Sequence, residues 1–182
     1  MRDTATTNGL RQEPRLTPVL PLDAAAVSAM AWDIWHRHYY PDILSLAAIR
    51  HLWDRAYRPE LIAADIDRGA SYRWIEREQT RVGFVAWRSD PAEPLLWLSK
   101  LYVVPECHGM GFGAHALACA ERAAHDRALP EIRLYVFKKN LRAIRAYQRA
   151  GFRIAQEEIS DAGSGFVYDD YVMSKTVASG AA

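Results

Sequence analysis

Leu101-Tyr102-Val103-Val104-Pro105-Glu106-Cys107-His108-Gly109-Met110-Gly111-Phe112-Gly113 decides the fold of this chain. An aromatic and β-branched run leads into three alternating glycines that open an amphipathic segment, which predicts a strand, a tight turn and a helix. Glycine tolerates positive φ and close approach of a ligand, and the free N–H groups of the first helical turn attract anions. The stretch therefore predicts a phosphate-binding turn, with a tight connection that binds nothing as the alternative.

Two general phosphate motifs compete for this turn. The Walker loop ends in Lys and Ser or Thr, whereas this turn continues into Ala114 and His115, so that motif is excluded. The dinucleotide fingerprint is matched nominally by Gly109, Gly111 and Ala114. Residues 137–139, Phe-Lys-Lys, stand where that motif needs an acidic residue, so dinucleotide binding is a minor alternative.

Composition narrows the class of protein. The 182 residues carry a formal charge of +1 and are 50% hydrophobic, which fits one domain and gives no charged surface for nucleic acid or an anionic membrane. Cys107 and Cys119 have no partners at zinc-ligand spacing, so reduced thiols and no metal are expected. The polar start and the lack of a run of about 20 apolar residues predict a cytoplasmic protein.

The pattern along the chain predicts one domain over residues 16–176, with flexible tails at residues 1–15 and 177–182. Asp23 is expected to cap the first helix. Further helices are predicted at 43–57, 61–66, 111–127 and 140–150, and strands at 72–75, 82–87, 95–104, 132–137, 152–155 and 166–173. This order predicts an α/β fold with a mixed sheet and helices on both faces.

Two motifs in order resemble a known family. His108 to Gly113 resembles the Arg/Gln-x-x-Gly-x-Gly/Ala pyrophosphate loop of the GCN5-related N-acetyltransferases (GNAT), after the similar lead-in Leu-Tyr-Val-Val-Pro-Glu. Asn140-x-x-Ala143-Ile144-x-x-Tyr147-x-x-x-Gly151-Phe152 resembles the second signature of that family. His108 departs from the family's Arg or Gln and lacks a permanent charge, so coenzyme affinity is expected to fall with rising pH.

The resemblance implies a mostly antiparallel, mixed sheet of about six to seven strands. Its central strands, 95–104 and 132–137, would splay apart and admit the pantetheine arm of acetyl-coenzyme A, the expected cosubstrate. The residues that the resemblance assigns to coenzyme binding are Leu101, Tyr102, Val103, His108, Gly109, Met110, Gly111, Phe112, Gly113 and Asn140.

For catalysis, the resemblance assigns Tyr147 as the proton donor to the departing sulfur. Asn140 and Tyr147 are seven residues apart, which places them on one helix face; the alternative is that Tyr147 only packs in the core. No base is assigned, because Tyr135 stands where some relatives have a glutamate. Water relayed from Ser99, Tyr135 or a carboxylate such as Glu93 or Asp169 could receive the amine proton.

The acceptor is expected to be a small amine. Family members form the amine site from the first helices and the last hairpin, where this chain has Trp32, Trp35, Tyr39, Tyr40, Trp53, Tyr57, Tyr168, Asp169, Asp170 and Tyr171. Aromatic faces and acids suit a cation such as a polyamine. A protein N-terminal or lysine acetyltransferase and a noncatalytic acyl-coenzyme A sensor are the alternatives, and a homodimer is left open.

Overall fold

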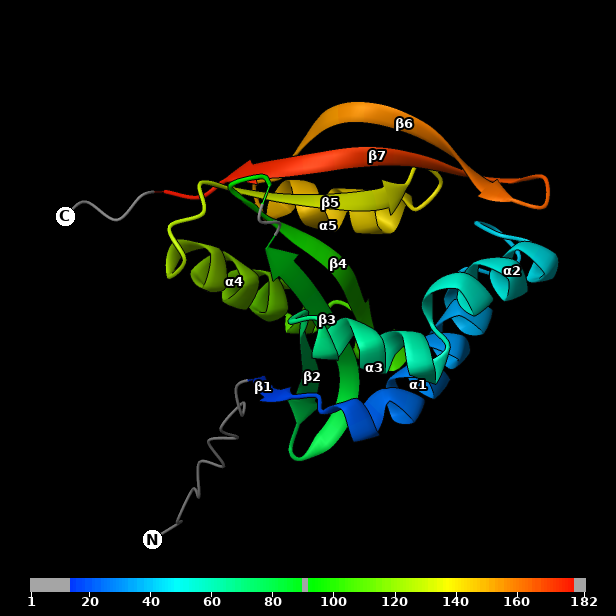
Figure 1. Cartoon of the computed structure of the whole chain (residues 1–182), viewed down its shortest axis with the longest axis horizontal. Helices are drawn as coiled ribbons and strands as arrows, with labels where there is room; N and C mark the ends of the chain where they lie inside the picture. The colour runs from blue at the N-terminus through cyan, green and yellow to red at the C-terminus, as the bar shows by residue number, and fades with distance from the viewer. Residues whose placement is uncertain (1–13, 90–91, 179–182) are drawn as a thin grey trace, which may run out of the picture.

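Seven strands form one mixed sheet in the order β1-β2-β3-β4-β5-β7-β6 (Figure 1). The computed structural model describes residues 14–89 and 92–178. All neighbouring strands are antiparallel except β4 and β5, so the predicted mixed, mostly antiparallel sheet is confirmed. The strands are β1 (Arg15–Pro18), β2 (Ser71–Arg77), β3 (Thr80–Ser89), β4 (Leu95–Val103), β5 (Glu131–Phe137), β6 (Arg153–Gly163) and β7 (Phe166–Thr176).

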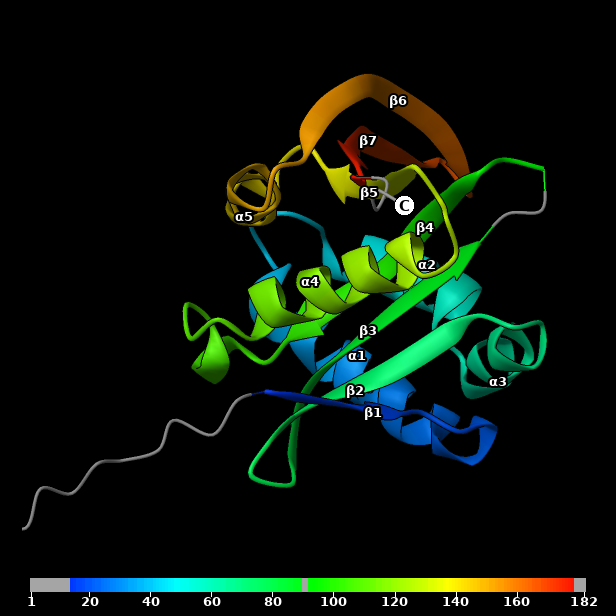
Figure 2. The ribbon, with the colours of Figure 1, turned by 90° about the vertical axis from the view of Figure 1, so that its left-hand side faces the viewer.

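Helices cover both faces of the sheet, as predicted (Figure 2). The apolar residues of α4 and α5 contribute to the core on one face, and those of α1, α2 and α3 contribute to the core on the other. The helices are α1 (Ala24–His38), α2 (Leu46–Ala56), α3 (Pro59–Asp67), α4 (Phe112–His125) and α5 (Leu141–Arg149), with short turns η1 (Pro21–Asp23) and η2 (Pro105–Cys107).

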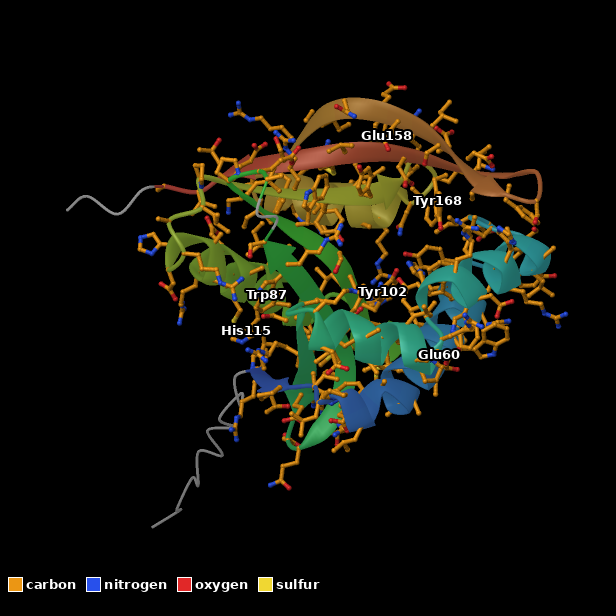
Figure 3. All side chains as sticks on the ribbon, in the orientation of Figure 1. Glu60, Trp87, Tyr102, His115, Glu158 and Tyr168 are labelled. Carbon is orange, nitrogen blue, oxygen red and sulfur yellow. The ribbon has the colours of Figure 1, made fainter. Side chains whose placement is uncertain are left out.

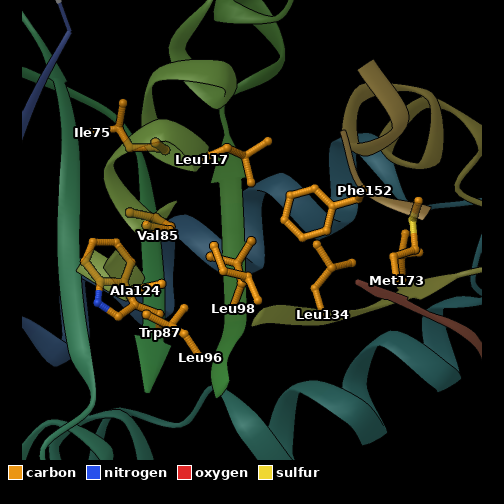
Figure 4. Close-up of a cluster of buried hydrophobic side chains, with 14 of the residues drawn as sticks. Ile75, Val85, Trp87, Leu96, Leu98, Leu117, Ala124, Leu134, Phe152 and Met173 are labelled. Atoms are coloured by element: carbon orange, nitrogen blue, oxygen red, sulfur yellow. The ribbon is translucent and has the colours of Figure 1, made fainter. Parts of the chain in front are cut away.

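The core under α4 joins both halves of the sheet. Ala116, Ala120 and Ala124 are fully buried and recur every four residues, so α4 presents a smooth apolar face to the strands. Opposite them lie large side chains from β2, β3, β4, β5 and β7, including Trp87, Leu98, Leu134 and Met173 (Figure 4). This packing fixes the end of β4 and the start of α4 relative to each other.

The central strands splay, as the resemblance implied. β4 and β5 pair in parallel from Leu95 with Glu131 to Leu98 with Leu134. Beyond these pairs β4 runs on to Val103 and β5 to Phe137, with no pairing between them. The sheet therefore divides into two wings, visible in Figure 1 as β1–β4 and β5–β7.

A β-bulge in β4 reverses the direction of its side chains. Trp87 pairs with Leu98 and Ala86 pairs with Lys100, so Ser99 has no partner on β3. Leu98 belongs to the core under α4, whereas Lys100 lies over the ring of Tyr57, on the side of α1–α3. Without the extra residue, alternation would place Lys100 on the same face as Leu98.

The ends of the domain differ from the prediction. Arg15 lies in β1, opposite Glu76, and Val177 is buried with its N–H donating to Pro130 O at 2.8 Å. Both residues belong to the folded domain rather than to the predicted tails. The remaining tail residues, 1–13 and 179–182, lie outside the described residues.

The predicted cap at Asp23 is wrong. Asp23 occupies the N-cap position of α1, but its side chain makes no cap hydrogen bond there. Its carboxylate instead accepts from the N–H of Leu20 at 3.1 Å and pairs with Arg81 at 3.2 Å. The turn η1 precedes α1 directly, so the carboxylate serves that turn.

Candidate active site

A cavity of about 630 Å³ opens where the central strands separate. Figure 3 labels Tyr102 of β4 and Tyr168 of β7, which line it from the two wings. The predicted site residues that line it are Leu101, Tyr102, Val103, His108, Gly109, Gly111, Phe112, Gly113, Asn140 and Tyr147. Met110 is not among the lining residues, and its side chain is 54% exposed. The splay thus brings nearly all the predicted residues into one hollow.

The glycine turn has the geometry of an anion site. Gly109 has φ +76° and Gly111, the N-cap of α4, has φ +90°. A Cβ built on Gly109, Gly111 or Gly113 would meet nothing within 4 Å, so the space above all three is open. The first intrahelical bond is donated by His115 N to Gly111 O, which leaves the N–H groups before it free. These free donors and the helix dipole suit a phosphate.

One edge of β4 faces the gap between the wings. The N–H of Val104 donates to Val82 O at 2.8 Å, toward β3. In antiparallel pairing the backbone groups then alternate, so those of Leu101 and Val103 face the gap. The carbonyl of Tyr102 lies against β3, where a Cβ on Gly83 would meet it at 2.2 Å. Tyr102, which the resemblance assigns to coenzyme binding, therefore turns its backbone carbonyl away from the gap and lines the cavity.

His108 is held by the end of β4. Its Nε2 lies 2.7 Å from Val103 O, while Nδ1 is buried with no partner among the described residues. Burial lowers the pKa of His108 below its usual value, with the backbone contact to Val103 opposing this shift. The ring is therefore neutral at pH 7, and the contact with phosphate stays a prediction.

Asn140 caps α5, as predicted. Its Oδ1 accepts from the N–H of Ala143 at 3.1 Å, and its Nδ2 donates to the hydroxyl of Tyr39 at 3.4 Å. The amide thus links the start of α5 to Tyr39, which belongs to the core on the opposite face of the sheet. The predicted contact of Asn140 with the coenzyme arm stays a prediction.

Tyr147 presents a phenol that can donate a proton. It lies two turns after Asn140, lines the cavity and packs against Phe152, with the ring centroids 5.8 Å apart. Within the described part of the chain its hydroxyl has no hydrogen-bond partner. Burial raises the pKa of Tyr147 to about 12, so the phenol stays protonated at neutral pH. Tyr147 thus packs in the core and also lines the cavity, and its role as proton donor stays a prediction.

Three tyrosines on the opposite face form a hydroxyl network. The hydroxyls of Tyr57 and Tyr102 lie 2.6 Å apart, and Tyr39 stacks on Trp35 with centroids at 5.1 Å. Burial raises the pKa of all three tyrosines well above 10, so they remain neutral. Among the aromatic residues predicted for the acceptor site, those that line the cavity are Trp35, Tyr39, Tyr57 and Tyr168, and those that do not are Trp32, Tyr40, Trp53 and Tyr171.

The two acids of the last hairpin face opposite ways. Asp170 lines the cavity, is 8% exposed, and has an Oδ1 without a hydrogen-bond partner in residues 14–89 and 92–178. Burial, and then the nearby carboxylates of Asp169 and Glu158, raise its pKa to about 6. Asp169 is outside the cavity and pairs with Lys138 at 2.6 Å. Asp169, which was considered as a base, is therefore turned away from the cavity, whereas Asp170 lines it.

The other residues considered as a base are placed less well. Ser99 lines the cavity, but its hydroxyl donates to Ala86 O at 3.2 Å. Tyr135 also lines it and stacks on Trp97, with centroids 5.0 Å apart. Glu93 is not a lining residue and lies 3.9 Å from Arg133.

Lys100 is the functional candidate that the sequence reasoning missed. It is 9% exposed, lines the cavity, and its Nζ lies 4.4 Å from the centroid of the Tyr57 ring. No described carboxylate lies within 4.0 Å of this Nζ. Burial lowers the pKa of Lys100 to about 8. The available signal was a charge in the middle of an apolar strand, between Leu98 and Tyr102.

Comparison with known proteins agrees with this geometry. Residues 29–152 match the model of the acetyltransferase (GNAT) family. The chain therefore belongs to the GNAT acetyltransferase family, and the predicted class, an N-acetyltransferase that uses acetyl-coenzyme A, is confirmed. Among curated proteins no sequence matches this chain.

Solved structures show the same fold at low sequence identity. The chain is similar to the PaiA N-acetyltransferase of Thermoplasma acidophilum, solved with coenzyme A, at 22% identity and a TM-score of 0.76, covering 90% of this chain and 99% of that one. A GCN5-related N-acetyltransferase from Rhodopseudomonas palustris is 20% identical with a TM-score of 0.76, and the match covers 92% of this chain and 98% of that one. The ribosomal-protein-S18-alanine N-acetyltransferase of Escherichia coli is 17% identical with a TM-score of 0.67, and the match covers 93% of this chain and 97% of that one.

Two features are absent from residues 14–89 and 92–178. None of their helices is long and apolar enough to cross a membrane. They contain no group of three or more His, Cys, Asp or Glu side chains that could hold a metal ion. The cytoplasmic location and the homodimer stay predictions.

Proposed function

We propose that this chain acetylates the primary amine of a small molecule, which enters the cavity with that amine as an ammonium group, and that Tyr147 is the proton donor and Asp170 the base. The observation that carries the proposal is a single cavity lined by the glycine turn, a protonated phenol and a carboxyl group whose pKa is raised to about 6. Acid and base with separated pKa values are the pair that acyl transfer from a thioester to an amine requires.

The coenzyme fits the hollow from the glycine turn to the splay. Its pyrophosphate lies at the free N–H groups that begin α4, beside Gly109 and Gly111. Its pantetheine amides pair with the backbone of Leu101 and Val103, as a peptide strand pairs with a sheet edge. Arg142 and Arg149 also line the cavity, so cationic side chains accompany the phosphates.

The chemistry then needs three proton movements. Asp170 receives the proton that the ammonium loses before attack, directly or through water. The amine nitrogen forms a bond to the thioester carbon, the carbon–sulfur bond breaks, and Tyr147 donates its proton to the departing sulfur, which leaves as a thiol. The second nitrogen proton, lost as the amide forms, passes through water to the Tyr147 phenolate, and Asp170 releases its proton to the solvent.

The walls around the acceptor side favour a small molecule over a protein segment. His51 of α2 contacts the last hairpin, with its Nε2 2.7 Å from Ala162 O and its ring stacked on Phe166 at 5.0 Å between centroids. This contact joins α2 to β6 and β7 beside the cavity. A protein acetyltransferase, like the S18-alanine enzyme of similar fold, would need room for a peptide there. A noncatalytic sensor would have no use for the free hydroxyl of Tyr147.

Asp170→Asn should lower kcat/KM at pH 7.5 by about tenfold, because the amine then depends on its small neutral fraction in solution. The pKa of Asp170 is raised, so its carboxylate form, and with it wild-type activity, should increase as the pH rises through about 6. The variant should lack this rise in activity near pH 6, and the difference in kcat/KM between the variant and the wild type should shrink toward pH 9. Thiol release measured from pH 5 to pH 9 tests this.

The matched control is Asp169→Asn, which removes the neighbouring acid that points away from the cavity and pairs with Lys138. Its pH profile should keep the rise, shifted to somewhat lower pH, because the charge of Asp169 helps to raise the pKa of Asp170. Equal losses in both variants would mean that general surface charge, rather than a base at Asp170, sets the profile.

A further inference from the structure

We propose that the acceptor carries an anionic group, most simply a carboxylate, in addition to its amine, and that Lys100 binds this group. The inference rests on the proposed function and narrows its substrate class to amino acids and their ω-amino relatives. The acids of the last hairpin suggest a polyamine, whose distal group is a second ammonium. The acceptor proposed here carries an anionic distal group instead.

The first support is that Lys100 is a buried cation that forms no ion pair within residues 14–89 and 92–178. The acid whose charge raises its pKa is Asp65 of α3, and the two oxygens of Asp65 already contact Arg68 at 2.6 Å and the hydroxyl of Tyr72 at 3.2 Å. Arg88 of β3 adds a repulsive positive charge. An ammonium removed from water is costly unless a partner compensates it, and a ring face does so only in part. An anionic ligand group would complete the site.

The second support is the side of the sheet on which Lys100 lies. The bulge at Ser99 turns the side chain of Lys100 toward the end of α2, over the ring of Tyr57. Tyr147, in contrast, packs against the core on the α4 side. The thioester would lie between these faces, so Lys100 borders the space from which the acceptor approaches. The coenzyme's phosphates cannot serve Lys100, because their site is at the glycine turn.

The third support is the distribution of charge around the cavity. Its other basic groups cluster near the coenzyme end: His38 and His108 have ring centroids 5.3 Å apart, and both feel the charge of Arg142. On the acceptor side, the described lining residues that carry a side-chain amine or carboxyl group are Lys100 and Asp170. One attracts an anion and the other holds an amine, which matches a zwitterion. A second ammonium would instead meet Lys100 and be repelled.

The spacing favours a spacer between amine and carboxylate. Lys100 lies on β4 and Asp170 on β7, with β5 between them. Paired strands such as β5 and β7 are about 4.8 Å apart, and at Lys100 β4 no longer pairs with β5 and lies farther from it. The backbones of Lys100 and Asp170 are therefore separated by more than about 10 Å. The lysine side chain shortens this distance. We therefore expect β-alanine or γ-aminobutyrate to be better acceptors than glycine.

The experiment compares three acceptors with the same amine and different distal ends: γ-aminobutyrate, n-butylamine and putrescine. With the wild-type protein and acetyl-coenzyme A, kcat/KM for the carboxylate should exceed that for the methyl-ended amine by about tenfold or more. Putrescine should be the poorest. In Lys100→Met, which keeps the length and loses the charge, the ratio of carboxylate to methyl should collapse toward one.

Lys175→Met is the matched control, since Lys175 pairs with Glu121 at 2.7 Å on the α4 side and should leave the ratio unchanged. Calorimetry with acetyl-coenzyme A reports whether each variant is folded. If Lys100→Met is not folded, the order of the three acceptors with the wild-type protein tests the inference. Putrescine or n-butylamine outperforming every amino acid would overturn the inference and leave the proposed function intact. If no amine in the panel, or only peptides, were acetylated, the proposed function would fail and this inference with it.

Discussion

Gly111→Asp is expected to weaken binding of acetyl-coenzyme A by at least about 100-fold, because it places a bulky anion where the pyrophosphate should lie. Gly111 is the N-cap of α4 with φ +90°, and the space above it is open. The carboxylate would occupy that space and would itself accept hydrogen bonds from the free N–H groups. Isothermal titration calorimetry on the folded variant measures the loss directly.

Gly69→Asp provides a control for backbone strain. Gly69 has φ +93°, nothing lies within 4 Å of a Cβ built there, and it does not line the cavity. A side chain at positive φ costs about 1–2 kcal/mol at either position. Gly69→Asp should therefore lose similar stability yet bind the coenzyme with wild-type affinity. Equal coenzyme affinities for the two variants would show that the glycine turn is not the phosphate site.

Tyr147→Phe is expected to lower kcat by about 100-fold while leaving coenzyme affinity unchanged. The substitution keeps the ring against Phe152 and removes only the hydroxyl, which has no partner within the described residues. An interaction made only in the transition state affects kcat and not ground-state binding. Steady-state kinetics with a saturating acceptor, together with calorimetry, separates the two quantities.

Tyr171→Phe is the companion variant, because Tyr171 packs against the same core without lining the cavity. It should retain full kcat. A Tyr147→Phe variant that also retains full kcat would make Tyr147 a packing residue, and another acid or water would have to protonate the sulfur.

Features set by local sequence were predictable. The turn from Gly109 to Gly113 follows from residues that accept positive φ, and the cap at Asn140 follows from one side chain and its own helix. The splay of β4 and β5 came from the resemblance, because no local pattern reports where two distant strands stop pairing.

Features that depend on strand register were not predictable. One unpaired residue, Ser99, turns Lys100 from the core under α4 to the acceptor side, and no propensity marks such a bulge. Asp169 and Asp170 are adjacent in sequence, and only the register of β7 decides which one lines the cavity. The proposed base and the proposed anion site could therefore not be predicted from sequence patterns.

Edge strands were the weakest point of the sequence reading. β6 extends from Arg153 to Gly163, well past the predicted strand at 152–155. The prediction stopped early because the middle of β6 is exposed and polar and shows no apolar alternation. β1 has only four residues and was assigned in part to a tail. A strand with one neighbour and a solvated face needs little apolar sequence.

The central claim is that this chain transfers acetyl groups from acetyl-coenzyme A to a small amine. Its most direct test is to incubate the protein with acetyl-coenzyme A and single amines, and to measure free thiol and N-acetylated product in the same sample. The account predicts amine-dependent turnover with one thiol released per N-acetyl group formed. Saturable binding of acetyl-coenzyme A with no amine-dependent thiol release, across mono-, di- and amino-acid amines, would contradict it.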